Sequence, residues 1–263
     1  MSDRINKIFN NKDTKLVTFT TGGDPDIDTS FEILKTIINN NVDIIEIGMP
    51  FSDPMADGPT IQESSTRSIK SGTKIGDIFQ IVNKVRALNK TIPIILMGYY
   101  NSIFNFGINN FTKKCNEVGI DGLIVVDLQP EEDSELQVKT REKNIDLIRL
   151  ITPTTDEKRL NTILKNSSGF LYYVTITGIT GQNSANLDEL KKSIDFIKSN
   201  TSLPIVAGFG IKNRQDVENI SKFTDGVVVG SSIVSIIKKN LNDKKKMINE
   251  IDLFTKDLIK GIK

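Results

Sequence analysis

Three acidic residues, Glu46, Asp53 and Asp57, lie within the short stretch EIGMPFSDPMADGPTIQ at 46–62. Glu46 belongs to the apolar run VDIIEIG, in which its carboxyl group is expected to be buried. A buried carboxylate without a partner is costly, and burial raises its pKa, which suits a group that must both give and take a proton. The two aspartates follow in a loop rich in proline, where aspartate is usually a turn-former. Their closeness to Glu46 nevertheless predicts an acid–base site built on carboxylates.

The chain contains no histidine and a single cysteine, Cys115. Proton transfer near neutral pH is usually carried by imidazole, so it must here use carboxylates, tyrosines, lysines or the one thiol. A zinc site of the ordinary ligand type needs several His or Cys side chains. We therefore expect no metal site.

Glycines mark a second place where chemistry is expected, near the end of the chain. The stretches GFGI at 208–211 and GSSIV at 230–234 each follow an apolar run and lead into a helical pattern. Glycine lets the backbone approach a ligand closely, and free N–H groups at a helix start bind phosphate. The stretch TGITGQNS at 177–184 is also rich in glycine, and it is interpreted as a mobile lid, with an ordinary surface loop as the alternative.

Eight short runs rich in Val, Ile and Leu supply the elements that must position these residues. Because the runs are continuously apolar, they predict strands covered on both faces, as in parallel sheets. The runs occupy 15–21, 42–48, 92–98, 121–127, 145–151, 169–175, 203–210 and 225–230.

Amphipathic helical patterns separate these runs, for example at 30–40 and 186–200. Eight alternating strand and helix units predict a single (β/α)8 TIM barrel over residues 1–263, with extra short helices that include one at the N-terminus. An open doubly wound sheet is the alternative, but the nucleotide fingerprint expected for it is missing. In such barrels the reactive groups lie at the C-terminal ends of the strands, where Glu46 is expected.

The overall charge and the N-terminal sequence argue against several classes of partner. Lys and Arg number 34 and Asp and Glu 33, so the formal net charge is +1 and no global field favours nucleic acid or an anionic membrane. The first residues lack the apolar core of a signal peptide, and no apolar run approaches the length of a membrane span. A cytoplasmic protein is expected.

The sequence closely resembles the tryptophan synthase alpha chain family. The stretch at 46–62, together with FTTGGDPD, YYVTITGITG, GFGI and GSSIV in the same order and spacing, carries a resemblance that covers essentially the whole chain. It implies a (β/α)8 barrel that cleaves indole-3-glycerol phosphate to indole and glyceraldehyde 3-phosphate. It also implies that indole passes to a beta chain, which carries the pyridoxal phosphate, and that the alpha chain itself needs no cofactor.

The resemblance assigns a role to individual residues. Glu46 is expected to be the acid–base carboxylate, and Asp57 the carboxylate that faces the indole N–H. Thr180 matches a lid residue that contacts the loop aspartate. The expected substrate-binding residues are Phe19, Ile61, Met97, Tyr99, Ile124, Tyr172, Thr180 and Phe209, and the expected phosphate-binding residues are Gly181, Gly210, Gly230 and Ser231.

The resemblance also implies that two alpha and two beta chains form a heterotetramer. The beta chain is expected to dock on the loop at 50–58 and on the segment YYNSIFNFG at 99–107, which we expect to expose Ile103, Phe104 and Phe106. The alternative is that these apolar groups fold back onto a neighbouring helix. The expected interface residues are Pro50, Asp53, Asn101, Phe104 and Asn105.

Two other functions are considered for this sequence. Another phosphate-binding barrel isomerase would share the late glycines but would not explain the stretch PFSDPMADGPTIQ. A catalytically idle barrel that only activates a beta chain is the second alternative. The presence of Glu46 and Asp57 argues against it.

Overall fold

The computed structural model describes residues 2–174, 184–208 and 210–262. Its nine strands form one parallel sheet in the order β5-β4-β3-β2-β1-β9-β8-β7-β6. This arrangement confirms the predicted TIM barrel. The strands are β1 (Lys15–Thr21), β2 (Ile44–Gly48), β3 (Ile94–Gly98), β4 (Gly122–Val125), β5 (Asp146–Leu147), β6 (Arg149–Ile151), β7 (Leu171–Val174), β8 (Ile205–Gly208) and β9 (Gly226–Val229).

The fifth predicted strand, at 145–151, is present as two short strands. Each pairs in parallel with a different neighbouring strand of the barrel. β5 pairs with β4, and the N–H of Ile148 still bonds the carbonyl of Leu123 at 2.9 Å. β6 pairs with β7 on the other side. The sequence therefore supplied eight runs for nine strands, because one run changes its pairing partner midway.

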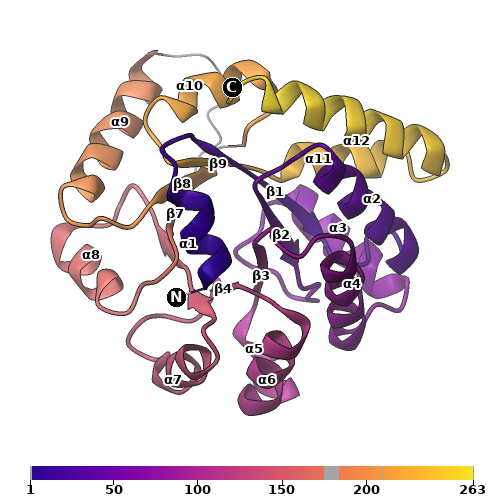
Figure 1. Cartoon of the computed structure of the whole chain (residues 1–263), viewed down its shortest axis with the longest axis horizontal. Helices are drawn as coiled ribbons and strands as arrows, with labels where there is room; N and C mark the ends of the chain where they lie inside the picture. The colour runs from indigo at the N-terminus through magenta and orange to yellow at the C-terminus, as the bar shows by residue number, and fades with distance from the viewer. Residues whose placement is uncertain (1, 175–183, 209, 263) are drawn as a thin grey trace.

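Helices surround the strands in Figure 1, and α1 lies across the opening of the barrel in that view. Several begin at residues that cap free N–H groups: Asp26 accepts from Thr29 N at 2.8 Å, and Asp156 accepts from Arg159 N at 2.7 Å. Among the described residues, no helix is both long and apolar enough to cross a membrane. The helices are α1 (Asp3–Phe9), α2 (Ile27–Asn39), α3 (Pro59–Lys70), α4 (Ile75–Leu88), α5 (Tyr100–Phe106), α6 (Ile108–Val118), α7 (Ser134–Glu142), α8 (Glu157–Leu164), α9 (Ser184–Lys198), α10 (Arg214–Ser221), α11 (Ser231–Lys239) and α12 (Lys244–Ile259).

Strand side chains alternate between the barrel interior and the layer under the helices. In β1, Val17 and Phe19 pack inside, whereas Leu16 packs with the helices. The interior cluster is closed at the N-terminal end by α1, whose Ile5 is fully buried in it. A functional site is therefore expected at the opposite end, at which the strands terminate.

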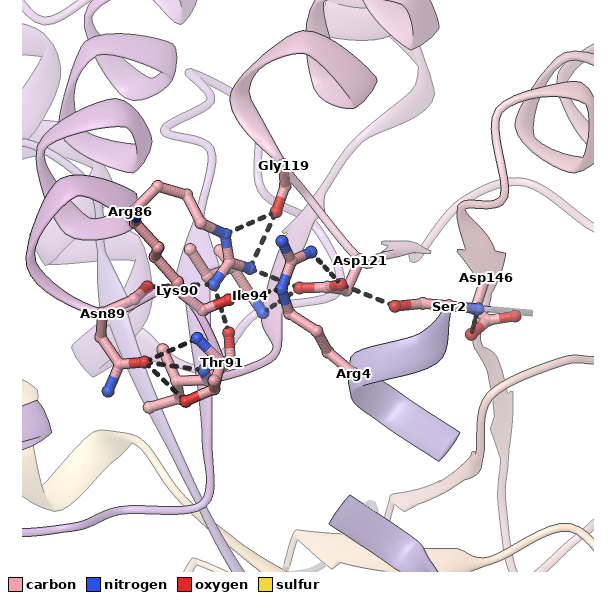
Figure 2. A network of polar contacts seen from close by, with 11 residues as sticks. Ser2, Arg4, Arg86, Asn89, Lys90, Thr91, Ile94, Gly119, Asp121 and Asp146 are labelled. Carbon is pink, nitrogen blue, oxygen red and sulfur yellow. Dashed lines mark hydrogen bonds and ion pairs between the residues drawn. The ribbon is translucent and has the colours of Figure 1, made fainter. Parts of the chain in front are cut away.

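A polar network ties the N-terminal segment to the barrel, and Asp121 is its centre (Figure 2). The Asp121 carboxylate accepts hydrogen bonds from Ser2 Oγ at 2.6 Å, Arg4 Nη1 at 3.0 Å, Arg86 Nη2 at 2.5 Å and the N–H of Ile94 at 2.9 Å. The N–H of Ser2 also donates to Asp146 Oδ2 at 2.9 Å. A buried carboxylate with four donors has its hydrogen-bonding capacity satisfied. The network therefore holds α1 against the N-terminal end of the barrel.

Candidate active site

Glu46 lies in the middle of β2 and points into the barrel. It is paired in register with Phe19 of β1 on one side and Ile95 of β3 on the other. Its side chain is 1% exposed, and Oε1 has no hydrogen-bond partner among the described residues. Burial, and secondly the negative charge of Asp57, raise the pKa of Glu46 to about 8. At neutral pH the carboxyl group therefore carries a proton that it can donate.

Asp57 lies in the loop between β2 and α3, directly before the helix. The N–H of Asp57 donates to the carbonyl of Pro54 at 3.0 Å, and the carbonyl of Asp57 accepts a hydrogen bond from Gln62 Nε2 of α3 at 2.9 Å. Tyr99 donates its hydroxyl proton to Asp57 Oδ2 at 3.1 Å. Burial raises the pKa of Asp57, and this hydrogen bond opposes the rise. The loop thus presents a half-buried carboxylate toward Glu46.

Both carboxyl groups line a cavity of about 550 Å³ at the C-terminal end of the barrel. The cavity brings together nine of the residues expected from the sequence to take part in catalysis, substrate binding or phosphate binding: Phe19, Glu46, Asp57, Ile61, Met97, Tyr172, Gly210, Gly230 and Ser231. Tyr99 lines a small recess beside it and reaches Asp57 through its hydroxyl. Ile124 is fully buried in the interior cluster and does not line the cavity. The predicted positions Thr180, Gly181 and Phe209, and most of the expected lid, lie outside the described residues.

Six further residues line the cavity without having been assigned a role from the sequence, although two of them belong to the stretch GFGI: Ala56, Gly58, Val174, Gly208, Ile211 and Val228. Strand alternation offered a signal for one of them, because residues two apart on a strand face the same way. Val174 follows Tyr172 by two positions on β7.

Close packing explains two of the glycines that line this cavity, and backbone conformation explains a third. A Cβ atom at Gly208 would lie 2.7 Å from the hydroxyl of Tyr172, and one at Gly230 would lie 3.1 Å from Cβ of Phe19. Gly210 has a φ of +61°, in the left-handed region that favours glycine. Side chains at these positions would occupy or distort the cavity wall.

The N-terminus of α11 opens at the cavity beside these glycines. Gly230 is its N-cap and offers no side chain to satisfy the first N–H groups. Ser232 Oγ donates to the carbonyl of Ile211 at 2.6 Å, which joins this helix start to the loop after β8. Uncapped N–H groups at a helix start favour an anion.

The expected partner interface lies on the surface outside this cavity. Asp53, Asn101, Phe104 and Asn105 are exposed, and Pro50 is half-buried. Phe104 is 61% exposed on α5, and Met55 of the nearby loop is 80% exposed. The expectation that Ile103 and Phe106 are exposed was wrong. The segment is a helix, so Ile103 turns inward and is fully buried, and the half-buried Phe106 packs on Phe79 at 5.6 Å between ring centroids.

A larger hollow of about 840 Å³ lies beside α1 at the opposite end of the barrel. Its buried carboxylate, Asp121, is already bonded by four donors, so we assign the chemistry to the cavity that contains Glu46. Among the residues that the structure describes, no cluster of three or more His, Cys, Asp or Glu side chains is placed to hold a metal ion.

Comparison with known proteins gives one consistent result. The sequence model of the family described as tryptophan synthase alpha chain matches residues 5–263. The tryptophan synthase alpha chain of Petrotoga mobilis is 42% identical over 255 residues, which cover 97% of this chain and 98% of the relative. The crystal structure of tryptophan synthase subunit alpha from Legionella pneumophila superposes with a TM-score of 0.92 at 32% identity, covering 100% of this chain and 98% of that one. A tryptophan synthase structure from M. tuberculosis, in its aminoacrylate-bound form, has a TM-score of 0.88 at 25% identity and covers 99% of both chains.

Proposed function

This chain belongs to the tryptophan synthase alpha chain family, the lyase that cleaves indole-3-glycerol phosphate to indole and glyceraldehyde 3-phosphate, and we propose that Glu46 and Asp57 carry out this cleavage. One observation carries the proposal. Glu46 is buried with its Oε1 atom unpartnered among the described residues, and it faces the same cavity as Asp57.

Glu46 moves both protons of the reaction. Its carboxylic acid first protonates C3 of the indole ring, which leaves positive charge on the ring nitrogen. The resulting carboxylate then takes the proton of the adjacent glycerol hydroxyl. The bond between C3 and the glycerol carbon breaks, its electron pair returns to the ring, and the carbon becomes an aldehyde. Glu46 ends as it began, so one carboxyl group with a raised pKa is sufficient.

Asp57 stabilises the positive charge that develops on the ring nitrogen. For this role it must be ionised, and the hydrogen bond from Tyr99 favours the charged form. The two carboxyl groups of the cavity therefore differ in what surrounds them. Glu46 is buried deeply enough to stay protonated, whereas Asp57 has a donor.

The indole ring and the phosphate bind at different walls of the cavity. Phe19, Ile61, Met97 and Tyr172 supply flat and apolar contacts for indole, and we extend this role to Tyr99, Ile124, Thr180 and Phe209 by resemblance alone. The phosphate binds at the uncapped start of α11, through Gly230 and Ser231, with Gly210 beside it. Gly181 joins them by resemblance.

The partner is a tryptophan synthase beta chain, in a complex of two alpha and two beta chains in the cytoplasm. It binds Pro50, Asp53, Asn101, Phe104 and Asn105, and the exposed ring of Phe104 is the apolar anchor. The pyridoxal phosphate belongs to the beta chain, because the alpha reaction described above needs no electron sink.

Steady-state kinetics of three variants tests the proposed roles. Asp57→Asn should lower kcat by about 100-fold or more, as expected for loss of a charge that acts in the transition state. Gly230→Val should mainly raise KM, because it fills the wall on which the phosphate binds. The control is Glu63→Gln, which changes an exposed carboxylate on α3 that pairs with Lys238. Near-parent turnover by Asp57→Asn would refute the assignment.

A further inference from the structure

Tyr99 connects the loop that carries Asp57 to helix α5. It follows β3 directly and is the N-cap residue of α5. Its hydroxyl accepts a hydrogen bond from the N–H of Ala56 at 3.0 Å and donates one to Asp57 Oδ2 at 3.1 Å. One side chain therefore holds two consecutive residues of the loop between β2 and α3.

The ring of Tyr99 is itself fixed. The side chain is 2% exposed, and its ring stacks on Phe51 with 4.9 Å between centroids and 23° between planes. Phe51 belongs to the start of the same loop. The loop is thus held to Tyr99 at two points, by ring stacking near its start and by hydrogen bonds near its end.

We propose that Tyr99 is a positioning residue, which fixes the place of the Asp57 carboxylate and joins it mechanically to α5. The proposal rests on the role given to Asp57 in the proposed function. It gives Tyr99 an action through another side chain, beyond the contact with indole that the resemblance implies. Because α5 also carries the exposed Phe104, displacement of this helix by a partner would move the hydroxyl on which Asp57 depends.

The charged and titratable groups around Asp57 agree with this role. Glu46 of β2 and Tyr172 of β7 both feel the charge of Asp57 across the cavity, and neither is bonded to it. The hydrogen bond to the Asp57 carboxylate comes from Tyr99. Burial, and then the charge of Asp57, raise the pKa of Tyr99, so its hydroxyl keeps the proton that it donates.

The variant Tyr99→Phe tests the proposal because it keeps the ring against Phe51 and removes the hydroxyl. The matched control is Tyr100→Phe, which removes the same atom from the next residue. Both variants are assayed as isolated chains with indole-3-glycerol phosphate over a range of pH, with thermal unfolding as a check of the fold. For Tyr99→Phe we expect kcat to fall roughly 10-fold or more, since a hydrogen bond to a charged group is lost.

The pH profile is the readout that a merely structural role would not change. Without the donor the pKa of Asp57 rises, so the acidic limb of kcat/KM should move to higher pH. In Tyr100→Phe this limb should stay where it is in the parent. An unmoved acidic limb in Tyr99→Phe, or an equal shift in both variants, would overturn the proposal.

A double-mutant cycle separates this proposal from the proposed function. If Tyr99 acts through Asp57, the change Tyr99→Phe should have little further effect on kcat in the Asp57→Asn background. Full additivity of the two changes would overturn the positioning role while leaving Asp57 essential. Near-parent turnover by Asp57→Asn alone would instead remove the proposed function, and the positioning role with it.

Discussion

Glu46 and Asp57 face one cavity from different segments of the chain, and Asp57 accepts a hydrogen bond from Tyr99 that opposes the rise of its pKa. Burial first, and the charge of Asp57 second, raise the pKa of Glu46 to about 8. Burial also raises the pKa of Asp57, and the hydrogen bond from the Tyr99 hydroxyl opposes this rise without cancelling it. A pair of carboxyl groups separated in this way can supply one acid and one stabilising anion at neutral pH.

This separation predicts a bell-shaped dependence of kcat/KM on pH. Activity should rise as Asp57 loses its proton and should fall again near pH 8, when Glu46 loses the proton that it must donate. The profile is measured on the isolated chain at concentrations of indole-3-glycerol phosphate well below KM, where the rate reports kcat/KM. A rate that continues to increase well above the pKa of Glu46 would mean that the ionised form starts the reaction.

The buried Glu46 also predicts a pH-dependent cost to stability. Its pKa is raised from the ordinary 4.5 to about 8 in the folded chain, so the unfolded chain releases this proton first as pH rises. Between these two values the folded state loses stability, by about 1.4 kcal/mol for each pKa unit at most, and the loss is complete above the folded pKa. Glu46→Gln carries no such proton and should gain stability relative to the parent as pH rises through this window.

Urea unfolding at about pH 5 and about pH 8 measures this gain directly. Glu63→Gln is the control, because that carboxylate is exposed and pairs with Lys238 on the surface. If Glu46→Gln and the parent keep the same difference in free energy of unfolding at both pH values, the buried carboxyl group does not titrate as described.

At the opposite end of the barrel, Asp121→Ala should destabilise the protein without a comparable loss of activity. The change leaves the partly exposed Arg4 and the half-buried Arg86 without their shared buried carboxylate, and the loss of a buried ion-pair partner costs up to about 3–5 kcal/mol. Asp252→Ala is the matched control, because its partner Lys256 is exposed and the expected cost is about 1 kcal/mol or less. Chemical denaturation checks both variants, and equal costs would contradict the role of the network in Figure 2.

Phe104→Ala should weaken activation by the beta chain and leave the basal rate unchanged. An exposed aromatic ring at the centre of an interface is a common anchor, and its loss typically costs about 2 kcal/mol or more of binding energy. The concentration of beta chain for half-maximal activation should therefore rise roughly 30-fold, measured by titration at constant substrate. Val138→Ala changes another exposed apolar residue, on α7, and serves as the control. If the beta chain activates Phe104→Ala as well as the parent, Phe104 is not an anchor of the interface.

The sequence predicted the fold well because hydrophobic runs are a local signal. All eight runs contain strands, and the burial of Glu46 follows from the run in which it lies. The burial of Ile103 was missed because the segment was treated as a loop, whereas a helix turns this side chain inward. The Asp121 network was also missed, since Ser2 lies 119 residues away in the sequence and no local pattern marks such a contact.

The link from Tyr99 to Asp57 illustrates what a sequence leaves open about a site. Both residues were singled out, but nothing in their types or spacing shows that one hydroxyl bonds a carboxylate 42 residues away. Contacts of this kind depend on how the loop folds over the barrel mouth. They can be identified only from the three-dimensional structure, in which the strands bring these segments together.

The turnover of indole-3-glycerol phosphate by Glu46→Gln tests the central claim most directly. The amide keeps the shape of the side chain and cannot carry a proton, so kcat should fall by about 100-fold to 10,000-fold while the fold and substrate binding are retained. Release of indole by the isolated chain is the measurement, with Glu63→Gln as the control. Release of indole by Glu46→Gln at close to the parent rate would contradict the account.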